Sequence, residues 1–386
     1  MNKAAAAALV AFATFTDIVA YSVAVPVLPD LGIRLGASPS TIGLLFAAFG
    51  VTLLTVSIPM GSVSDRVGRR LPLVGGLVAL ALSTLLFAFA EGLPWLFAAR
   101  LAQGAADAVT WVVGFALIAD LYGPEERGRV MGMVMSATTF GLMVGPSLGG
   151  WLYERGGARV PYLAVSALAL VSAGTFLWLR MPAAHSGEPI SVRLAIRVPA
   201  VRACVGAVVL VAATVTMLEP VMSMWLASTI GLTPARVGLV FGSAAAAGLV
   251  LHPIYGGLAD RWGGRRLTLT GLIVMALLLP LVPLGWSFRS AAGIYIVAIA
   301  GIGLVITPSL AYMGESMSAA GVESFGVAYG FYNVAWGVGL LVGPAVGGVL
   351  YERIGFQSLT VCWSLVAMAV TTIIARVGRA SLASAL

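Results

Sequence analysis

The sequence predicts an all-α membrane protein in which 12 transmembrane helices form two pseudo-symmetric six-helix bundles. The prediction rests on the composition, on the spacing of the apolar runs and on a repeat that relates the two halves of the chain. Of the 386 residues, 60% are hydrophobic and only 10% are charged, whereas a typical soluble domain is about 25% charged. This composition excludes a soluble enzyme and a disordered chain. It also excludes a nucleic-acid-binding domain, because the net charge of +7 is divided among short clusters between apolar runs.

The spacing of the apolar runs predicts the individual helices. A membrane-spanning helix needs about 20 predominantly apolar residues, and every backbone polar group inside a bilayer must be hydrogen-bonded within the protein. Runs of this length are therefore helices. Charge clusters separate them, and we place the spans near residues 4–27, 41–60, 72–90, 95–122, 130–152, 161–180, 204–228, 237–257, 267–286, 291–316, 324–350 and 358–375.

The basic residues predict the orientation of these spans. Most of them fall in loops on the same side as the N-terminus, for example Lys3, Arg127, Arg202 and Arg376. Because cytoplasmic loops carry the excess of lysine and arginine, we expect a multi-pass protein of the cell (inner) membrane with both termini in the cytoplasm.

A polar segment near the middle of the chain predicts the division into two bundles. Residues 181–203 contain three prolines and no long apolar run. We therefore expect an N-terminal bundle over 1–180, a cytoplasmic linker over 181–203 and a C-terminal bundle over 204–386.

The two halves of the chain repeat each other. The segment Gly61–Arg70 recurs with changes as Gly257–Arg266, and Gly145–Arg155 recurs as Gly343–Arg353 at nearly the same distance along the chain. Two long motifs at one offset indicate related bundles. Such bundles can rock about a central site and expose it to each side of the membrane in turn.

Further motifs lie inside the spans. Arg100-Leu-Ala-Gln-Gly104 is in span four, and a glycine-proline motif occupies Gly141–Gly150 in span five. On these motifs and the repeated loop after span two, the chain resembles the major facilitator superfamily over essentially its whole length, in particular its drug–proton antiporter branch. Phe15-Thr-Asp17 and Met217-Leu-Glu219-Pro220 resemble the first and seventh helices of vesicular monoamine transporters, so the chain looks like a prokaryotic homologue of that group.

The resemblance is incomplete at several positions. Vesicular amine transporters carry a lysine in span two and an aspartate in span eleven, and the matching positions here hold Phe49 and Asn333. Losing both members together is what an ion pair requires, because one buried charge left alone is strongly destabilising. We therefore expect a substrate pocket of different shape, with Asn333 on its wall.

Two carboxyl groups are predicted to bind protons or a cationic substrate. Asp17 lies near the middle of span one, where an ionisable group is costly and its presence suggests a function. Glu219 precedes Pro220, which kinks a helix by removing a backbone hydrogen bond, and the kink can open a polar space beside the carboxylate. Trp225 is either a wall of this pocket or part of the interfacial aromatic belt.

Span four adds a second pair of charges, Arg100 and Asp107, which share one helix face. The resemblance implies that Arg100 is a fixed charge that acts on the proton-carrying acids, and the alternative is a structural ion pair. Asp107 has two interpretations of equal weight, a proton relay or the partner of Arg100.

The cytoplasmic loops are predicted to hold gates. The resemblance implies that Asp65 faces a helix N-terminus across the bundle interface, and that Arg66 or Arg69 pairs with Asp120. The alternative for the arginines is simple anchoring on the cytoplasmic side. The second half repeats the pattern, with the corresponding gate residues Asp260, Arg261, Arg265 and Glu315.

The glycine-proline motif of span five consists of Gly141, Gly145, Pro146, Gly149 and Gly150. Small residues at this spacing let two helices approach closely. In antiporters the motif is taken to prevent a proton leak, and the alternative here is packing alone.

The resemblance implies a secondary transporter that exports lipophilic cationic or aromatic amines in exchange for protons. Its partners would be a small organic cation, protons and the lipid bilayer, and we expect a monomer that binds no nucleic acid. No cofactor or metal is expected, because the chain has no ATP-binding Gly-Lys-Ser/Thr sequence and its two cysteines, Cys204 and Cys362, show no metal-ligand spacing. The alternatives are a multidrug exporter that also takes neutral compounds, a symporter, and a receptor or scaffold that transports nothing.

Overall fold

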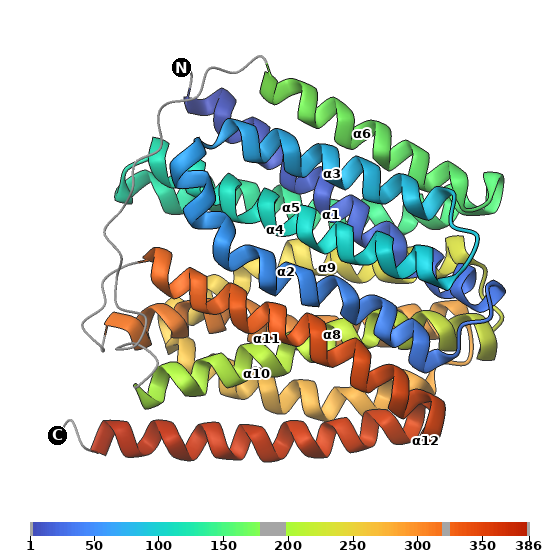
Figure 1. The fold of residues 1–386 in the computed structure, drawn as a ribbon. Helices are drawn as coiled ribbons and strands as arrows, with labels where there is room; N and C mark the ends of the chain where they lie inside the picture. Colours follow the sequence, from blue (N-terminus) through green and yellow to red (C-terminus); the bar gives the residue numbers. More distant parts are fainter. Residues whose placement is uncertain (1–2, 178–197, 319–324, 384–386) are drawn as a thin grey trace.

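The fold is all-helical in the part of the chain that the computed structural model describes, residues 3–177, 198–318 and 325–383 (Figure 1). The helices follow in the order α1 (Lys3–Arg34), α2 (Pro39–Val67), α3 (Arg70–Ala88), α4 (Leu93–Leu121), α5 (Pro124–Gly156), α6 (Arg159–Leu177), α8 (Pro199–Thr229), α9 (Pro234–Trp262), α10 (Gly264–Leu278) with the 3₁₀ helix η1 (Leu279–Leu284), α11 (Phe288–Ser318) and α12 (Phe325–Ala383).

Eleven helices within the described residues are long and apolar enough to cross a membrane. The last of them, α12, is 59 residues long and contains one non-helical residue, Gly355, with a φ of 75°. Glycine adopts this left-handed backbone without the steric penalty that other residues incur. The break falls between the last two spans expected from the sequence, near 324–350 and 358–375. The chain is therefore a multi-pass membrane protein.

The helices pack in two groups. Most contacts lie within α1 to α6 or within α8 to α12, and we call these groups the first half and the second half. The two halves meet chiefly along two helix pairs, α2 with α12 and α5 with α9.

The polar ends of the helices define two ends of the molecule. We call the end that holds Lys3, Asp65 and Asp120 the inner end, and the end that holds Arg34 and Glu154 the outer end, following the orientation expected from the sequence. Helix α1 begins and α12 ends at the same end of the helix array, on the left in Figure 1.

The start of the second half differs from the sequence expectation. Most of the linker expected over 181–203 lies outside the described residues, but α8 already begins at Pro199. Proline fits the first turn of a helix because its missing N–H would have no partner there. Residues 199–203 are therefore helical rather than part of a linker.

Candidate functional site

Two carboxyl groups face each other in the interior of the first half. Asp17 on α1 is 1% exposed and Asp107 on α4 is 6% exposed, and their side chains lie within hydrogen-bonding reach of each other. The indole Nε1 of Trp111 donates a hydrogen bond of 2.9 Å to Asp17 Oδ2, while Asp17 Oδ1 has no hydrogen-bond partner. Two carboxylates so close repel each other unless a proton or another cation lies between them.

The local sequence of α1 explains why Asp17 needs hydrogen-bond partners from another helix. The hydroxyls of Thr14 and Thr16 donate hydrogen bonds to carbonyl oxygens one turn back, at Val10 and Phe12. Their polar groups are satisfied within the helix. Asp17 has no such internal donor, so it depends on α4 for its partners.

The third carboxyl group, that of Glu219, connects the two halves. Glu219 on α8 is 8% exposed, and its Oε2 accepts a hydrogen bond of 2.5 Å from the phenol of Tyr21 on α1. Tyr21 is one turn beyond Asp17. The contact therefore joins the first half to the second half close to the acidic pair, and sequence reasoning did not predict it because the two residues are 198 positions apart.

Arg100 is fully buried and has no carboxylate partner among the described residues. Its Nη1 donates to Gln103 Oε1 at 2.9 Å, whereas Nε and Nη2 have no partner. The guanidinium instead lies 4.5 Å from the ring centre of Phe46 and 5.5 Å from that of Tyr21, within the range of cation–π attraction. The structural ion pair with Asp107 is therefore absent from this conformation.

The other two residues predicted to line the pocket, Trp225 and Asn333, differ in exposure. Trp225 is 7% exposed and packs against Phe356, with ring centres 5.3 Å apart, so it belongs to the core of the second half rather than to an interfacial belt. Asn333 on α12 is exposed. Phe49, by contrast, is buried and lies against Tyr21, with ring centres 5.0 Å apart.

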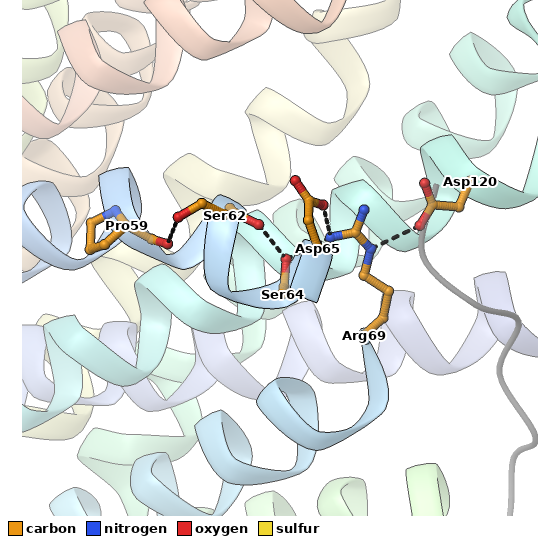
Figure 2. A network of polar contacts seen from close by, with 7 residues as sticks. Pro59, Ser62, Ser64, Asp65, Arg69 and Asp120 are labelled. Atoms are coloured by element: carbon orange, nitrogen blue, oxygen red, sulfur yellow. Dashed lines mark hydrogen bonds and ion pairs between the residues drawn. The ribbon is translucent and has the colours of Figure 1, made fainter. Parts of the chain in front are cut away.

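At the inner end, Arg69 joins two carboxylates (Figure 2). Its Nη1 contacts Asp65 Oδ1 at 2.5 Å, and its Nε contacts Asp120 Oδ2 at 2.8 Å. Ser64 Oγ accepts a further hydrogen bond of 2.6 Å. The side chain of Arg69 is only 4% exposed, whereas Arg66 is exposed. Of the two arginines considered for Asp120, the structure thus pairs Arg69, and the cluster lies within the first half rather than across the interface.

The second half does not copy this cluster. Glu315 Oε1 accepts a hydrogen bond of 2.9 Å from the backbone N–H of Gly264, where α10 begins. Arg265 donates to the carbonyl oxygen of Ala375 at 3.2 Å. Asp260 and Arg261 are exposed and form no ion pair in the portion of the chain described here.

The glycine-proline motif serves two contacts. Gly141, Gly145 and Gly149 lie against α1, where added Cβ atoms would meet Ile18, Ser22 and Val23. Gly150, on another face of α5, lies against the backbone of Pro234 at the start of α9. The motif therefore packs α5 both within the first half and against the second half.

Sequence reasoning missed two glutamates at the outer end. Glu154 Oε1, at the end of α5, accepts a hydrogen bond of 2.8 Å from the backbone N–H of Ala235 at the start of α9. Glu352 Oε2 accepts one of 2.7 Å from the N–H of Ser40 at the start of α2. Each contact joins the halves, because a carboxylate of one half satisfies an unpaired N–H at a helix N-terminus of the other. Both glutamates belong to the repeated Tyr-Glu-Arg sequence, which was the available signal.

Comparison with known proteins identifies a matching family model and relatives of similar sequence. The family model described as Major Facilitator Superfamily matches residues 10–203 and 204–382. The chain is 31% identical to the chromaffin granule amine transporter of Rattus norvegicus over 324 residues, which are 83% of this chain and 62% of the relative. It is also 31% identical to the probable vesicular acetylcholine transporter-B of Danio rerio, over 93% of this chain and 76% of the relative. The chain thus spans less than two thirds of the length of the amine transporter.

A solved structure has the same fold. It is a bacterial homolog of the human lysosomal transporter Spinster, in an inward-facing and occupied conformation, and it matches with a TM-score of 0.83 over 97% of this chain and 96% of the other. The sequence identity is 14%, so this likeness concerns the fold alone.

Proposed function

Because the chain belongs to the Major Facilitator Superfamily, we propose that this transporter is a proton-coupled antiporter that exports lipophilic cationic amines. Its resemblance to vesicular amine transporters supports a transporter of amines rather than an enzyme. The single observation that carries the finer proposal is the set of three buried carboxyl groups, Asp17, Asp107 and Glu219. Among the described residues, Arg100 is the cation that acts on Glu219.

In this proposal, protons and the amine compete for the same carboxyl groups. A protonated carboxyl group is neutral and no longer attracts an ammonium group, whereas a charged carboxylate attracts it strongly in a medium of low dielectric constant. The site therefore holds either protons or the amine, and this exclusion couples the two fluxes. Arg100 cannot deprotonate, so it supplies a constant positive charge that keeps Glu219 from binding a cation too tightly.

We further propose that the two halves alternate between two conformations. The close contacts of α5 with α9 and of α2 with α12 hold the outer end closed, as Gly150 and Gly43 illustrate. The remaining features of the proposal are 12 spans in two six-helix bundles, an inner membrane location, cytoplasmic termini and a monomer.

The cluster of Asp65, Arg69 and Asp120 at the inner end acts, in this proposal, when the inner end is closed. Asp65 is 39% exposed, in contrast to Arg69, so its carboxylate stays accessible to the second half when the inner end closes. We propose that Asp65, Arg69 and Asp120 then form the cytoplasmic gate, with Asp260, Arg261, Arg265 and Glu315 on the opposite side. A carboxylate near a helix N-terminus is favoured by the helix dipole.

Proton movement driven by an amine tests this function directly. Purified protein is placed in liposomes that contain a pH-sensitive dye, and tyramine is added outside. An antiporter expels protons from the lumen as tyramine enters, a symporter brings protons in with it, and a receptor moves neither. We expect antiport in the wild type and no concentrative tyramine uptake in Asp17→Asn, because the amide cannot carry the charge. Uptake near the wild-type level in Asp17→Asn would remove Asp17 from the mechanism.

The second candidate, a broad multidrug exporter, is favoured by one observation. Phe49, at a position where vesicular amine transporters carry lysine, places an aromatic ring beside Tyr21 and Arg100. An aromatic ring at this position suits neutral aromatic compounds as well as amines. Transport of a quaternary ammonium compound and of its neutral carbon isostere separates the candidates: the amine antiporter prefers the cation, and equal transport at every pH would establish the multidrug exporter.

A further inference from the structure

We propose that Tyr21 is the coupling residue of this transporter. Its phenol is hydrogen-bonded to Glu219 when the carrier is empty, and this bond prevents the empty carrier from changing conformation. This inference rests on the proposed function and specifies how the same site is regulated. The observation behind it is the hydrogen bond of 2.5 Å from the Tyr21 hydroxyl to Glu219 Oε2, which connects α1 of the first half to α8 of the second half.

The surroundings of Tyr21 hold its hydroxyl in this position. The residue is 7% exposed, and Phe49 packs against its ring with ring centres 5.0 Å apart. The guanidinium of Arg100 lies 5.5 Å from the ring centre, where the ring faces a positive charge. The phenol therefore contacts both the fixed cation and the carboxylate, and its hydroxyl donates to Glu219 Oε2.

The groups around Glu219 show why a phenol is suited to this task. Tyr21 approaches from α1, Arg100 from α4 and Tyr295 from α11, and no ammonium or guanidinium group forms an ion pair with Glu219 in the described structure. A hydrogen bond to a charged acceptor is about twice as strong as one between neutral groups. The contact is thus strong while Glu219 is charged and empty, and it weakens when a proton neutralises the carboxylate.

The contact affects only one step of the transport cycle. A proton that arrives from outside neutralises Glu219, the halves rock, and the proton leaves on the inside. Glu219 is then charged, and Tyr21 binds it across the interface and holds the outer end closed. The ammonium group of an amine can replace the phenol as the partner of the carboxylate, after which the loaded carrier returns. Without Tyr21 the empty carrier would return as well, and protons would enter without export of amine.

The variant Tyr21→Phe tests this proposal because it removes one hydroxyl and keeps the ring. In the liposome assay, with a pH gradient and no amine, we expect proton entry to rise about tenfold over the wild type, the scale expected for losing a hydrogen bond to a charged group. In the same variant tyramine should bind more tightly at equilibrium, because it no longer competes with the phenol. A misfolded variant would lose binding instead.

Tyr162→Phe is the matched control. Tyr162 is a buried tyrosine of the first half, and its hydroxyl has no hydrogen-bond partner. We expect neither a proton leak nor tighter tyramine binding in this variant.

The possible outcomes are distinct. If Tyr21→Phe binds tyramine more weakly and shows no leak, Tyr21 is a substrate contact and the coupling proposal is overturned. A leak of equal size in both variants would overturn it too. If the wild type itself exchanges no protons for tyramine, it is the proposed function that fails.

Discussion

The two ends of the molecule use similar polar contacts for opposite purposes. At the outer end, Glu154 and Glu352 accept hydrogen bonds from helix N-termini of the opposite half. At the inner end, Arg69 joins two carboxylates of its own half, and Glu315 accepts from the start of α10 in its own half. The outer contacts therefore hold the halves together, whereas the inner contacts hold each half in shape.

Glycine packing shows the same difference. At the outer end, a Cβ atom built on Gly43 or Gly150 would overlap backbone atoms of the other half. Toward the inner end, Gly128, Gly132 and Gly257 have no heavy atom within 4 Å of such a Cβ. A change of conformation must therefore break the outer contacts, but it can leave the inner clusters intact and move each half as a unit.

The largest expected effect comes from two glycines of α5. Gly150→Leu places a side chain against the backbone of α9 and should prevent closure of the outer end, because overpacking of a close contact is not relieved by a rotamer change. We expect tyramine transport to fall more than about tenfold. Gly132→Leu, on the same helix, meets open space and should transport normally.

Both glycine variants should keep the thermal stability of the wild type in detergent, because the affected contact lies between the halves and not within one. Equal losses of transport in the two variants would show that the outer and inner glycines do not differ in role.

The second expected effect is on the stability of the first half. Arg69→Lys keeps the charge but cannot bridge Asp65 and Asp120 with a planar fork. We expect unfolding to become easier by about 1–2 kcal/mol, less than for a fully buried pair because Asp65 is partly exposed. Thermal unfolding in detergent measures this change. Arg66→Lys is the control, and an equal loss there would indicate that only the number of positive charges matters.

The smallest effect should come from the outer carboxylates. Glu154→Gln and Glu352→Gln each keep a hydrogen-bond acceptor and remove the charge that favours the helix N-terminus. Each variant should make a cysteine placed at the outer end modestly more reactive, and the double variant more so. The exposed Cys362 is first replaced by serine.

Glu315→Gln is the matched control for these variants, because Glu315 binds a helix N-terminus of its own half. It should not raise the reactivity of the outer cysteine, because it removes no contact that closes the outer end. A rise as large as that of Glu154→Gln would contradict the distinction between contacts across the halves and contacts within one.

The sequence predicts some of these features well because they depend on local chemistry. Charged residues in apolar runs, such as Asp17 and Glu219, stand out in a linear sequence, and both are buried in the structure. The apolar runs likewise predict the helices, apart from boundaries such as Pro199. The repeat predicts that related segments occupy corresponding positions in the two halves.

Features that depend on long-range pairing could not be predicted. The sequence does not distinguish Arg66 from Arg69 as the partner of Asp120, because both lie one turn or less from Asp65. The repeated Tyr-Glu-Arg sequence marks Glu154 as one of a pair, but it does not indicate that Glu154 contacts the start of α9. The pairing of Tyr21 with Glu219 depends on how the two halves face each other, and no local pattern contains that information.

The most direct test of the account is a pair of distances measured by double electron–electron resonance in lipid nanodiscs. Spin labels at Glu91 and Trp286 report on the outer end, and labels at Glu126 and Trp262 report on the inner end; all four residues are exposed. At high pH without amine, we expect a short outer distance and a long inner distance. Lower pH or added tyramine should produce a second population in which the outer distance is longer and the inner distance is shorter. Distances that never change, or that lengthen together, would contradict alternating access.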